Sequence, residues 1–196
     1  MRVSNRHIGN RGVTLIELLV ALAIAAILIG AGIPSFLSMI QRSNIDGATR
    51  QVMYEIRTVQ NLAVTRGGVF GFHWGADPAV GMATSVYRVE RDPSGICAAP
   101  PNGWPAAGAT TATVCADGAP CVIRDWFDLV TEYTGVTIQS VTDGSGNPVG
   151  GVMFNSRGAS LNNCGVVTFP VRVTVVDTSG ATRIIRVERA GRVFIQ

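Results

Sequence analysis

An unbroken apolar stretch near the N-terminus places the strongest constraint on how this chain folds. From Val13 to Ile33 the only polar residues are Thr14 and Glu17. A helix needs about 20 predominantly apolar residues to cross a hydrocarbon core about 30 Å thick, so the stretch predicts a membrane-spanning helix. A carboxylate inside such a helix costs about 3 kcal/mol to insert and is by default a functional residue. Glu17 therefore requires a partner.

The residues before this stretch are basic. They include Arg2, Arg6 and Arg11 and no acidic residue, which is typical of a flank that stays on the cytoplasmic side of the membrane. An ordinary secretory signal is cut after its apolar core, and the core is then lost from the mature protein. Here the position suited to cleavage is Gly12, before the apolar core, so cleavage there would keep the helix.

The run from Gly12 to Glu17, GVTLIE, resembles the class III leader of type IV prepilins and type II secretion pseudopilins. The resemblance implies that a prepilin peptidase removes residues 1–12 by cleaving after Gly12. It also implies N-methylation of the new N-terminus at Val13, where most members have phenylalanine. Pro34 lies where many members also have proline, and we expect a helix kink there.

Cleavage after Gly12 would create an α-amino group at Val13, whose ordinary pKa is about 8. In the low-dielectric core of a filament, that cation and Glu17 of a neighbouring subunit would neutralise each other. The resemblance implies this role of Glu17 in filament assembly. The alternative is a plain signal anchor, in which Glu17 extends toward the lipid headgroups.

The helix is predicted to continue beyond the membrane. Apolar residues recur every three to five positions from Phe36 to Ala63, and Arg66-Gly67-Gly68 is a typical C-terminal stop. One helix over 13–66 is therefore expected, with a transmembrane and filament-core part (13–33) and an amphipathic part (34–66).

Residues 67–196 are expected to form a β-rich, periplasmic head domain, which gives an α+β fold. The resemblance implies a lollipop in which the long helix packs on an antiparallel β domain. Turn sequences at 143–148, 178–180 and 190–191 predict hairpin connections, and 96–113 predicts a surface loop. The expected strands are Val69–Trp74, Ser85–Arg91, Cys121–Phe127, Val136–Val141, Val152–Asn155, Val166–Val176, Arg183–Glu188 and Arg192–Ile195.

The four cysteines, Cys97, Cys115, Cys121 and Cys164, all follow the apolar stretch. An even number of cysteines in an exported domain favours disulfides. A zinc site would need close ligand pairs and usually histidine, so no metal is expected. The Asp-Gly turn signal between Cys115 and Cys121 favours that pair, which leaves Cys97 with Cys164.

The sequence lacks the residues that enzyme chemistry requires. His73 is the sole histidine after the leader, no Gly-x-Ser-x-Gly motif accompanies it, and we expect a partly buried structural histidine. A chain without lysine cannot form a phosphate-binding Gly-Lys loop. The Asp143–Asn147 segment copies the start of a calcium loop, but Pro148 and Phe154 occupy the glycine and glutamate positions, which favours a turn. A non-enzyme without cofactors is therefore expected.

The C-terminal region resembles the GspH/FimT family of minor pilins and pseudopilins. The resemblance is carried by Val152–Ala159 and Arg183–Val193, and the Cys115–Cys121 segment followed by Asp125-Trp126 is similar to the FimT side of the family. Phe127–Val130 departs from the family by replacing a second Gly-Trp pair.

The resemblance implies a structural minor pseudopilin of the H type in the type II secretion system, held in the inner membrane and then in a periplasmic pseudopilus. The alternatives are a FimT/FimU-like minor pilin of a type IV pilus and a DNA-binding competence pilin. The implied partners are other pilins or pseudopilins, the prepilin peptidase and N-methyltransferase, and an inner-membrane assembly platform.

Four arginines near the C-terminus are candidates for DNA contact: Arg183, Arg186, Arg189 and Arg192, opposed in the sequence by Glu188 alone. Without the three leader arginines, 13 of the 16 basic residues remain against 13 acidic ones, so bulk attraction of nucleic acid is not expected. Residues three apart on a strand also point to opposite faces. A solvated strand face is the alternative to DNA contact.

Overall fold

The computed structural model describes residues 13–75, 83–92, 111–113, 115, 118–161 and 168–196, with the backbone alone at 31–35. The chain divides into two compact units, Met1–Ile40 and Gln41–Gln196. The second unit contains the β domain together with the C-terminal half of the long helix. The domain boundaries expected at residues 12, 33 and 66 stay predictions.

The long helix α1 extends from Leu15 to Arg66, so it starts at Leu15 rather than at Val13. At its end Gly67 adopts a φ of +68°, and the Gly68 amide donates to the Ala63 carbonyl at 3.2 Å. This is the Schellman geometry, in which glycine takes the left-handed conformation without a Cβ clash. The predicted helix stop is confirmed.

No helix within the described part of the chain is both long enough and apolar enough to cross a membrane.

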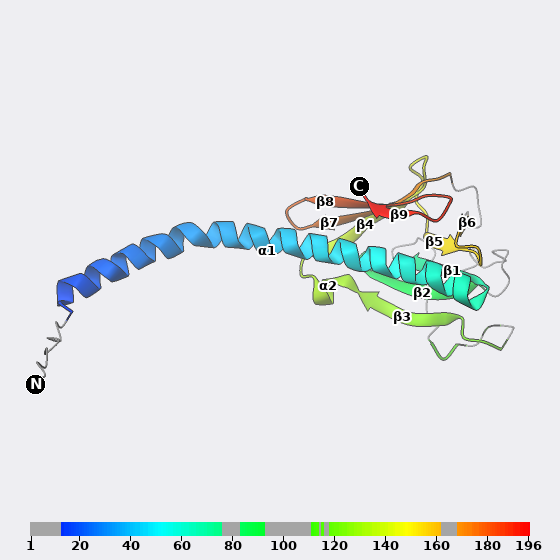
Figure 1. The fold of residues 1–196 in the computed structure, drawn as a ribbon, viewed down its shortest axis with the longest axis horizontal. Coiled ribbons are helices and arrows are strands. Elements are labelled where there is room, and N and C mark those ends of the chain that lie inside the picture. The colour runs from blue at the N-terminus through cyan, green and yellow to red at the C-terminus, as the bar shows by residue number, and fades with distance from the viewer. Residues whose placement is uncertain (1–12, 76–82, 93–110, 114, 116–117, 162–167) are drawn as a thin grey trace, which may run out of the picture. The chain divides into compact units, whose positions relative to one another are not determined.

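The described strands form two antiparallel sheets (Figure 1). The five-stranded sheet has the order β3-β2-β1-β5-β6, and the four-stranded sheet has the order β4-β7-β8-β9. A single helical turn, α2 (Leu129–Glu132), follows β3. An α+β fold is confirmed. The strands are β1 (Val69–Trp74), β2 (Val86–Asp92), β3 (Val122–Asp128), β4 (Val136–Thr142), β5 (Gly151–Phe154), β6 (Ser160–Leu161), β7 (Val171–Asp177), β8 (Thr182–Val187) and β9 (Val193–Ile195).

The core of the second unit joins α1 to both sheets. A stripe of six helix residues is fully buried, and it packs with Phe70 and Phe72 of one sheet and Val173 and Ile185 of the other. Burial of this apolar surface, at about 25 cal/mol per Å², is the main force that holds the helix on the sheets. The stripe consists of Ile45, Ala48, Val52, Ile56, Val59 and Ala63. Phe36, Leu37 and Ile40, which belong to the same predicted pattern, are exposed.

The predicted hairpin turn at 143–148 is present, with an antiparallel bridge between Thr142 and Pro148, but the longer strands on either side do not pair with each other. The segment does form a tight turn, because Asp143 Oδ1 accepts from the amides of Ser145 at 2.9 Å and Asn147 at 2.8 Å. However, β4 before it belongs to the four-stranded sheet and β5 after it pairs with β1 in the other. Local side-chain hydrogen bonds decide the reversal, whereas the following strand finds its partner elsewhere.

The other differences from the expected strands are small. The strand expected over 166–176 begins at Val171, because Pro170 has no amide hydrogen for the ladder. Residues 166 and 167 lie outside the described part. The hairpins at 178–180 and 190–191 are confirmed, since β7 pairs with β8 and β8 with β9. The two-residue strand β6 and the helix α2 were not predicted.

Candidate functional site

The N-terminal end of α1 is built by a reciprocal pair of hydrogen bonds between Thr14 and Glu17. The Glu17 amide donates to Thr14 Oγ1, and the Thr14 amide and hydroxyl donate to Glu17 Oε2, each at 3.3 Å. This is a capping box, which satisfies amide groups that have no partner inside the helix. Sequence reasoning missed it, although the spacing Thr-x-x-Glu before an apolar run is its usual signal.

Glu17 is surrounded by exposed apolar side chains. Val13, Leu15 and Ile16 are each more than half exposed. Within the described part of the chain, Glu17 pairs with no basic side chain. An exposed apolar surface of this kind marks contact with a membrane or with another protein. The carboxylate is thus held in place by hydrogen bonds at the start of its own helix.

Several predicted site residues are outside the reach of the structure. Gly12, Cys97 and Cys164 lie outside the described residues. Pro34 lies within α1, where only the backbone is described. Cleavage after Gly12, methylation of Val13, the kink at Pro34 and the pairing of Cys97 with Cys164 therefore stay predictions.

The structure contains a disulfide between Cys115 and Cys121, with a Cα–Cα distance of 5.2 Å. Two backbone hydrogen bonds of 2.9 Å close the loop, from Cys115 to the Ala119 carbonyl and from Gly118 to the Cys115 carbonyl. The Cys121 carbonyl also accepts from the Arg91 amide of β2 at 2.7 Å. This backbone hydrogen bond attaches the C-terminal end of the disulfide loop to the five-stranded sheet.

The four C-terminal arginines do not form one row. Arg183 Nε donates to Asp46 Oδ1 of α1 at 2.9 Å. The charge of Arg183 is therefore balanced by Asp46, a residue that the sequence did not point to. Arg186 and Arg192 both face Glu188, at 3.9 Å and 2.5 Å. Arg189 is exposed in the turn after β8. DNA contact by these residues stays a prediction.

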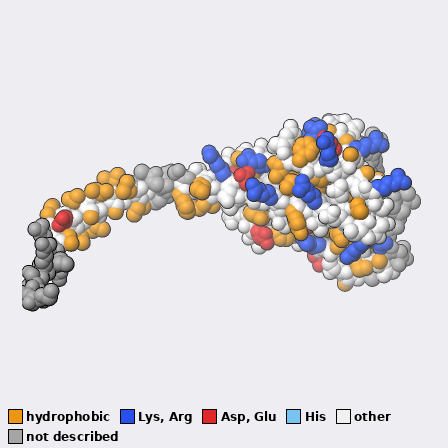
Figure 2. Space-filling model, in the orientation of Figure 1, with side chains coloured by type: hydrophobic (Ala, Val, Ile, Leu, Met, Phe, Trp, Pro, Cys, Tyr) orange, Lys and Arg blue, Asp and Glu red, His pale blue; other side chains and the backbone are white. Residues whose placement is uncertain are grey.

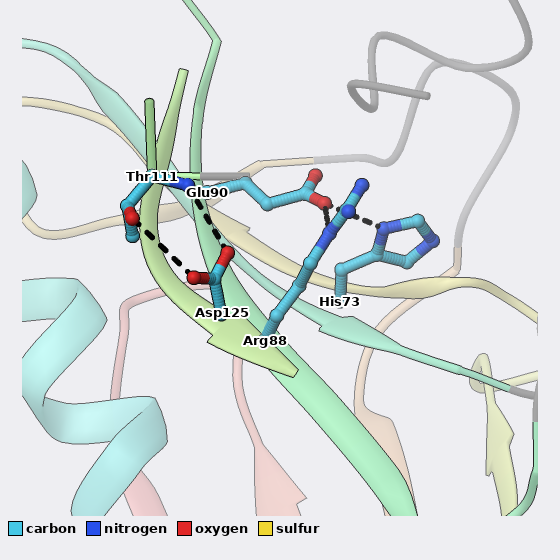
Figure 3. Close-up of polar contacts among 5 residues, drawn as sticks. All are labelled: His73, Arg88, Glu90, Thr111 and Asp125. Atoms are coloured by element: carbon cyan, nitrogen blue, oxygen red, sulfur yellow. Dashed lines mark hydrogen bonds and ion pairs between the residues drawn. The ribbon is translucent and has the colours of Figure 1, made fainter. Parts of the chain in front are cut away.

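A buried polar cluster lies on the face of the five-stranded sheet that points away from α1. His73 of β1 and Arg88 and Glu90 of β2 share this face, because His73 pairs with Arg88 in the register and Glu90 is two residues further along. His73 Nδ1 lies 3.1 Å from Glu90 Oε1, and Arg88 Nε also contacts that oxygen (Figure 3). Arg88 additionally stacks over the Trp126 ring, 4.4 Å from its centre.

His73 is fully buried, whereas a partly buried histidine was expected. Buried charges persist only when they are paired and hydrogen-bonded, which the shared Glu90 oxygen provides. Close by, the Asp125 carboxylate accepts from the amide and hydroxyl of Thr111 at 3.1 Å and 3.3 Å (Figure 3). The shared Glu90 oxygen ties β1 to β2 through side chains, so the arrangement supports the sheet.

Residues 9–33 match the family described as "Prokaryotic N-terminal methylation motif". The match confirms the prepilin-type methylation motif that the sequence predicted. It covers Arg11, the Gly12–Val13 junction and the apolar stretch through Ile33. Among curated proteins, none matches the chain significantly.

Solved structures of a minor pilin and of a minor pseudopilin are similar to this chain. The type IV minor pilin FimU of Pseudomonas aeruginosa is 12% identical, with a TM-score of 0.47, and the match covers 79% of this chain and 90% of FimU. The minor pseudopilin EpsH from the type 2 secretion system of Vibrio cholerae is 10% identical, with a TM-score of 0.48 and coverage of 78% and 96%. Identities and scores this low carry no functional information.

Proposed function

We propose that this chain, which carries an N-terminal methylation motif ahead of an α+β domain, is a structural minor pseudopilin of the H type in a type II secretion system. A FimT/FimU-like minor pilin of a type IV pilus is the alternative. The observation that supports the proposal is the lone carboxylate, Glu17, held by a capping box at the start of an exposed apolar helix within that motif.

The proposed mechanism is assembly without catalysis by this chain. Before assembly, residues 13–33 anchor the protein in the inner membrane, with the head in the periplasm. Removal of residues 1–12 frees the Val13 amine, and the helix then packs among the helices of other pilins. Glu17 neutralises the N-terminal amine of a neighbour, because an unpaired charge in that apolar core costs several kcal/mol, about 3 to 5. The ion pair sets the axial position of the subunit.

The first prediction concerns leader removal. We expect the protein extracted from membranes of cells with an active prepilin peptidase to begin at a methylated Val13. Intact-mass analysis and N-terminal peptide mapping measure this directly. Cells without the peptidase are the control and should retain residues 1–12. Retention of the leader in cells with active peptidase would contradict the proposal.

The second prediction separates the two machines. Deletion of the gene is expected to abolish release of secreted proteins while leaving surface pili and natural transformation intact. Loss of pili with normal secretion would select the pilus alternative. Loss of transformation alone, together with a salt-dependent DNA gel shift that disappears in Arg186→Ala/Arg192→Ala, would favour the competence pilin. Complementation with the intact gene is the control.

A further inference from the structure

The exposed side of α1 in the second unit carries a mixed apolar and basic surface. Arg50, Tyr54 and Arg57 follow one another at helical spacing on the side opposite the buried stripe. Arg57 Nη2 donates to the Val193 carbonyl at 2.8 Å, which joins this surface to β9. Tyr54 is 61% exposed and Ile195 of β9 is 37% exposed. We define the basic flank as Arg50, Tyr54, Arg57 and Ile195.

The positive charge of the basic flank is not compensated within the described part of the chain. Neither Arg50 nor Arg57 forms an ion pair there. Asp46, one turn earlier on α1, is engaged by Arg183 at 2.9 Å. Figure 2 shows arginine side chains interleaved with hydrophobic ones over this part of the surface. Such a surface fits an acidic partner that also offers apolar side chains.

A surface of the opposite charge lies on β3 and α2. Its carboxylates are exposed and make no ion pair among the described residues, and Val130 adds an exposed apolar side chain between them. The segment is close to α1, since a Cβ placed on Gly47 would lie 2.7 Å from the Tyr133 ring just after α2. We define the acidic flank as Asp125, Asp128, Val130 and Glu132.

The two flanks border the same helix from different sides. The acidic flank adjoins α1 at Gly47 through Tyr133, whereas β8 and β9 adjoin it through the Asp46–Arg183 and Arg57–Val193 contacts. When two copies lie side by side with parallel helices, the acidic flank of one copy would therefore face the basic flank of the other. A contact between two different surfaces of identical subunits is heterologous, and when its rotation does not close it generates a helical filament.

We propose that the acidic flank of one copy docks on the basic flank of a second copy of this chain. The charges steer the encounter and set its register, and Tyr54, Ile195 and Val130 supply apolar contact at its centre. The proposal deepens the proposed function, on which it rests, by naming the head surfaces through which a filament subunit meets its neighbour.

Charge reversal on the full-length chain in nonionic detergent tests this contact. Sedimentation should show self-association of the wild type at low salt that declines as salt is raised. Arg50→Glu/Arg57→Glu makes both flanks acidic, and Asp125→Arg/Glu132→Arg makes both basic, so each variant alone should associate about tenfold or more weakly. An equimolar mixture of the two variants should restore association, because each then meets a flank of opposite charge.

Arg157→Glu/Arg189→Glu is the matched control, because both arginines are exposed, lie in turns outside the two flanks and give the same change in net charge. It should associate as the wild type does. A wild type that stays monomeric at low salt, an equal loss in this control, or a mixture that does not associate would each overturn the docking proposal.

Incorporation into sheared filaments separates failure of the docking from failure of the proposed function. If the wild type enters filaments and both reversed variants enter as well, the flanks are not the contact and the proposed function stands. If the wild type never enters filaments, the proposed function fails, and sedimentation alone decides whether the flanks bind each other. We expect entry of the wild type and of Arg157→Glu/Arg189→Glu, and strongly reduced entry of each flank variant.

Discussion

Replacement of Glu17 by alanine is expected to remove the protein from filaments almost completely, while membrane insertion and leader cleavage continue. The apolar helix is unchanged by the substitution, so insertion is preserved. In the filament, the N-terminal amine of a neighbour would lose its counter-ion at a cost of about 3 to 5 kcal/mol, which lowers incorporation by more than about a hundredfold. Immunoblots of the membrane and sheared-filament fractions measure both quantities.

Glu17→Gln separates the charge of Glu17 from its role at the helix start. Glutamine still accepts a hydrogen bond from Thr14, so it preserves the capping box seen in the structure. It cannot neutralise an amine. We expect this variant to fail in assembly as the alanine variant does. Normal incorporation of Glu17→Gln would show that Glu17 acts through the helix cap, and the ion-pair mechanism would be abandoned.

The second large effect is expected at the contact between Glu55 of α1 and Arg124 of β3. The Glu55 side chain is fully buried, and Oε1 receives Arg124 and the Gln51 amide, the latter at 3.2 Å. Oε2 has no hydrogen-bond partner among the described residues. Burial raises the pKa of Glu55, and the neighbouring Arg124 offsets that rise only in part. The helix therefore packs on the sheet with a carboxylate that depends on a single guanidinium.

Arg124→Ala should lower the free energy of unfolding by about 1 to 3 kcal/mol at neutral pH. Loss of one partner of a fully buried ion pair costs about 3 to 5 kcal/mol. The loss of stability is smaller here because Arg124 is 49% exposed and its charge is screened by water. Denaturant titration of the full chain in detergent, followed by tryptophan fluorescence, measures the loss. Trp74 lies in β1 and Trp126 in β3, so the signal reports on the five-stranded sheet.

The pH dependence follows from the raised pKa of Glu55. A raised pKa means that the folded state holds the proton more tightly, so this group favours folding below its ordinary value of 4.5 and that contribution is lost as pH rises. The deficit of Arg124→Ala should therefore be smaller at acidic pH than at pH 7. Arg157→Ala is the control, because Arg157 is exposed and forms no ion pair with any described residue. The double variant Glu55→Leu/Arg124→Ala should recover stability, and a persistent deficit would contradict the ion-pair explanation.

Much of the local structure was predictable because its signals lie within a few residues. Gly67 and Gly68 predict the end of α1, and β1 has the predicted bounds, Val69–Trp74. The Asp-Gly turn between Cys115 and Cys121 likewise predicted a disulfide that the structure contains. The Thr14–Glu17 capping box is equally local, because the Thr-x-x-Glu spacing signals it, but it was not predicted.

What the sequence determined by itself was therefore the long helix, the approximate strands and the methylation motif, since periodicity, caps and turn residues act over one or two turns of chain. Only the tertiary structure decided that β4 and β5 part into different sheets, that His73, Arg88 and Glu90 meet, and that charged flanks of opposite sign border α1. These features depend on contacts between residues far apart in the chain, which compete through burial and pairing rather than through local preference.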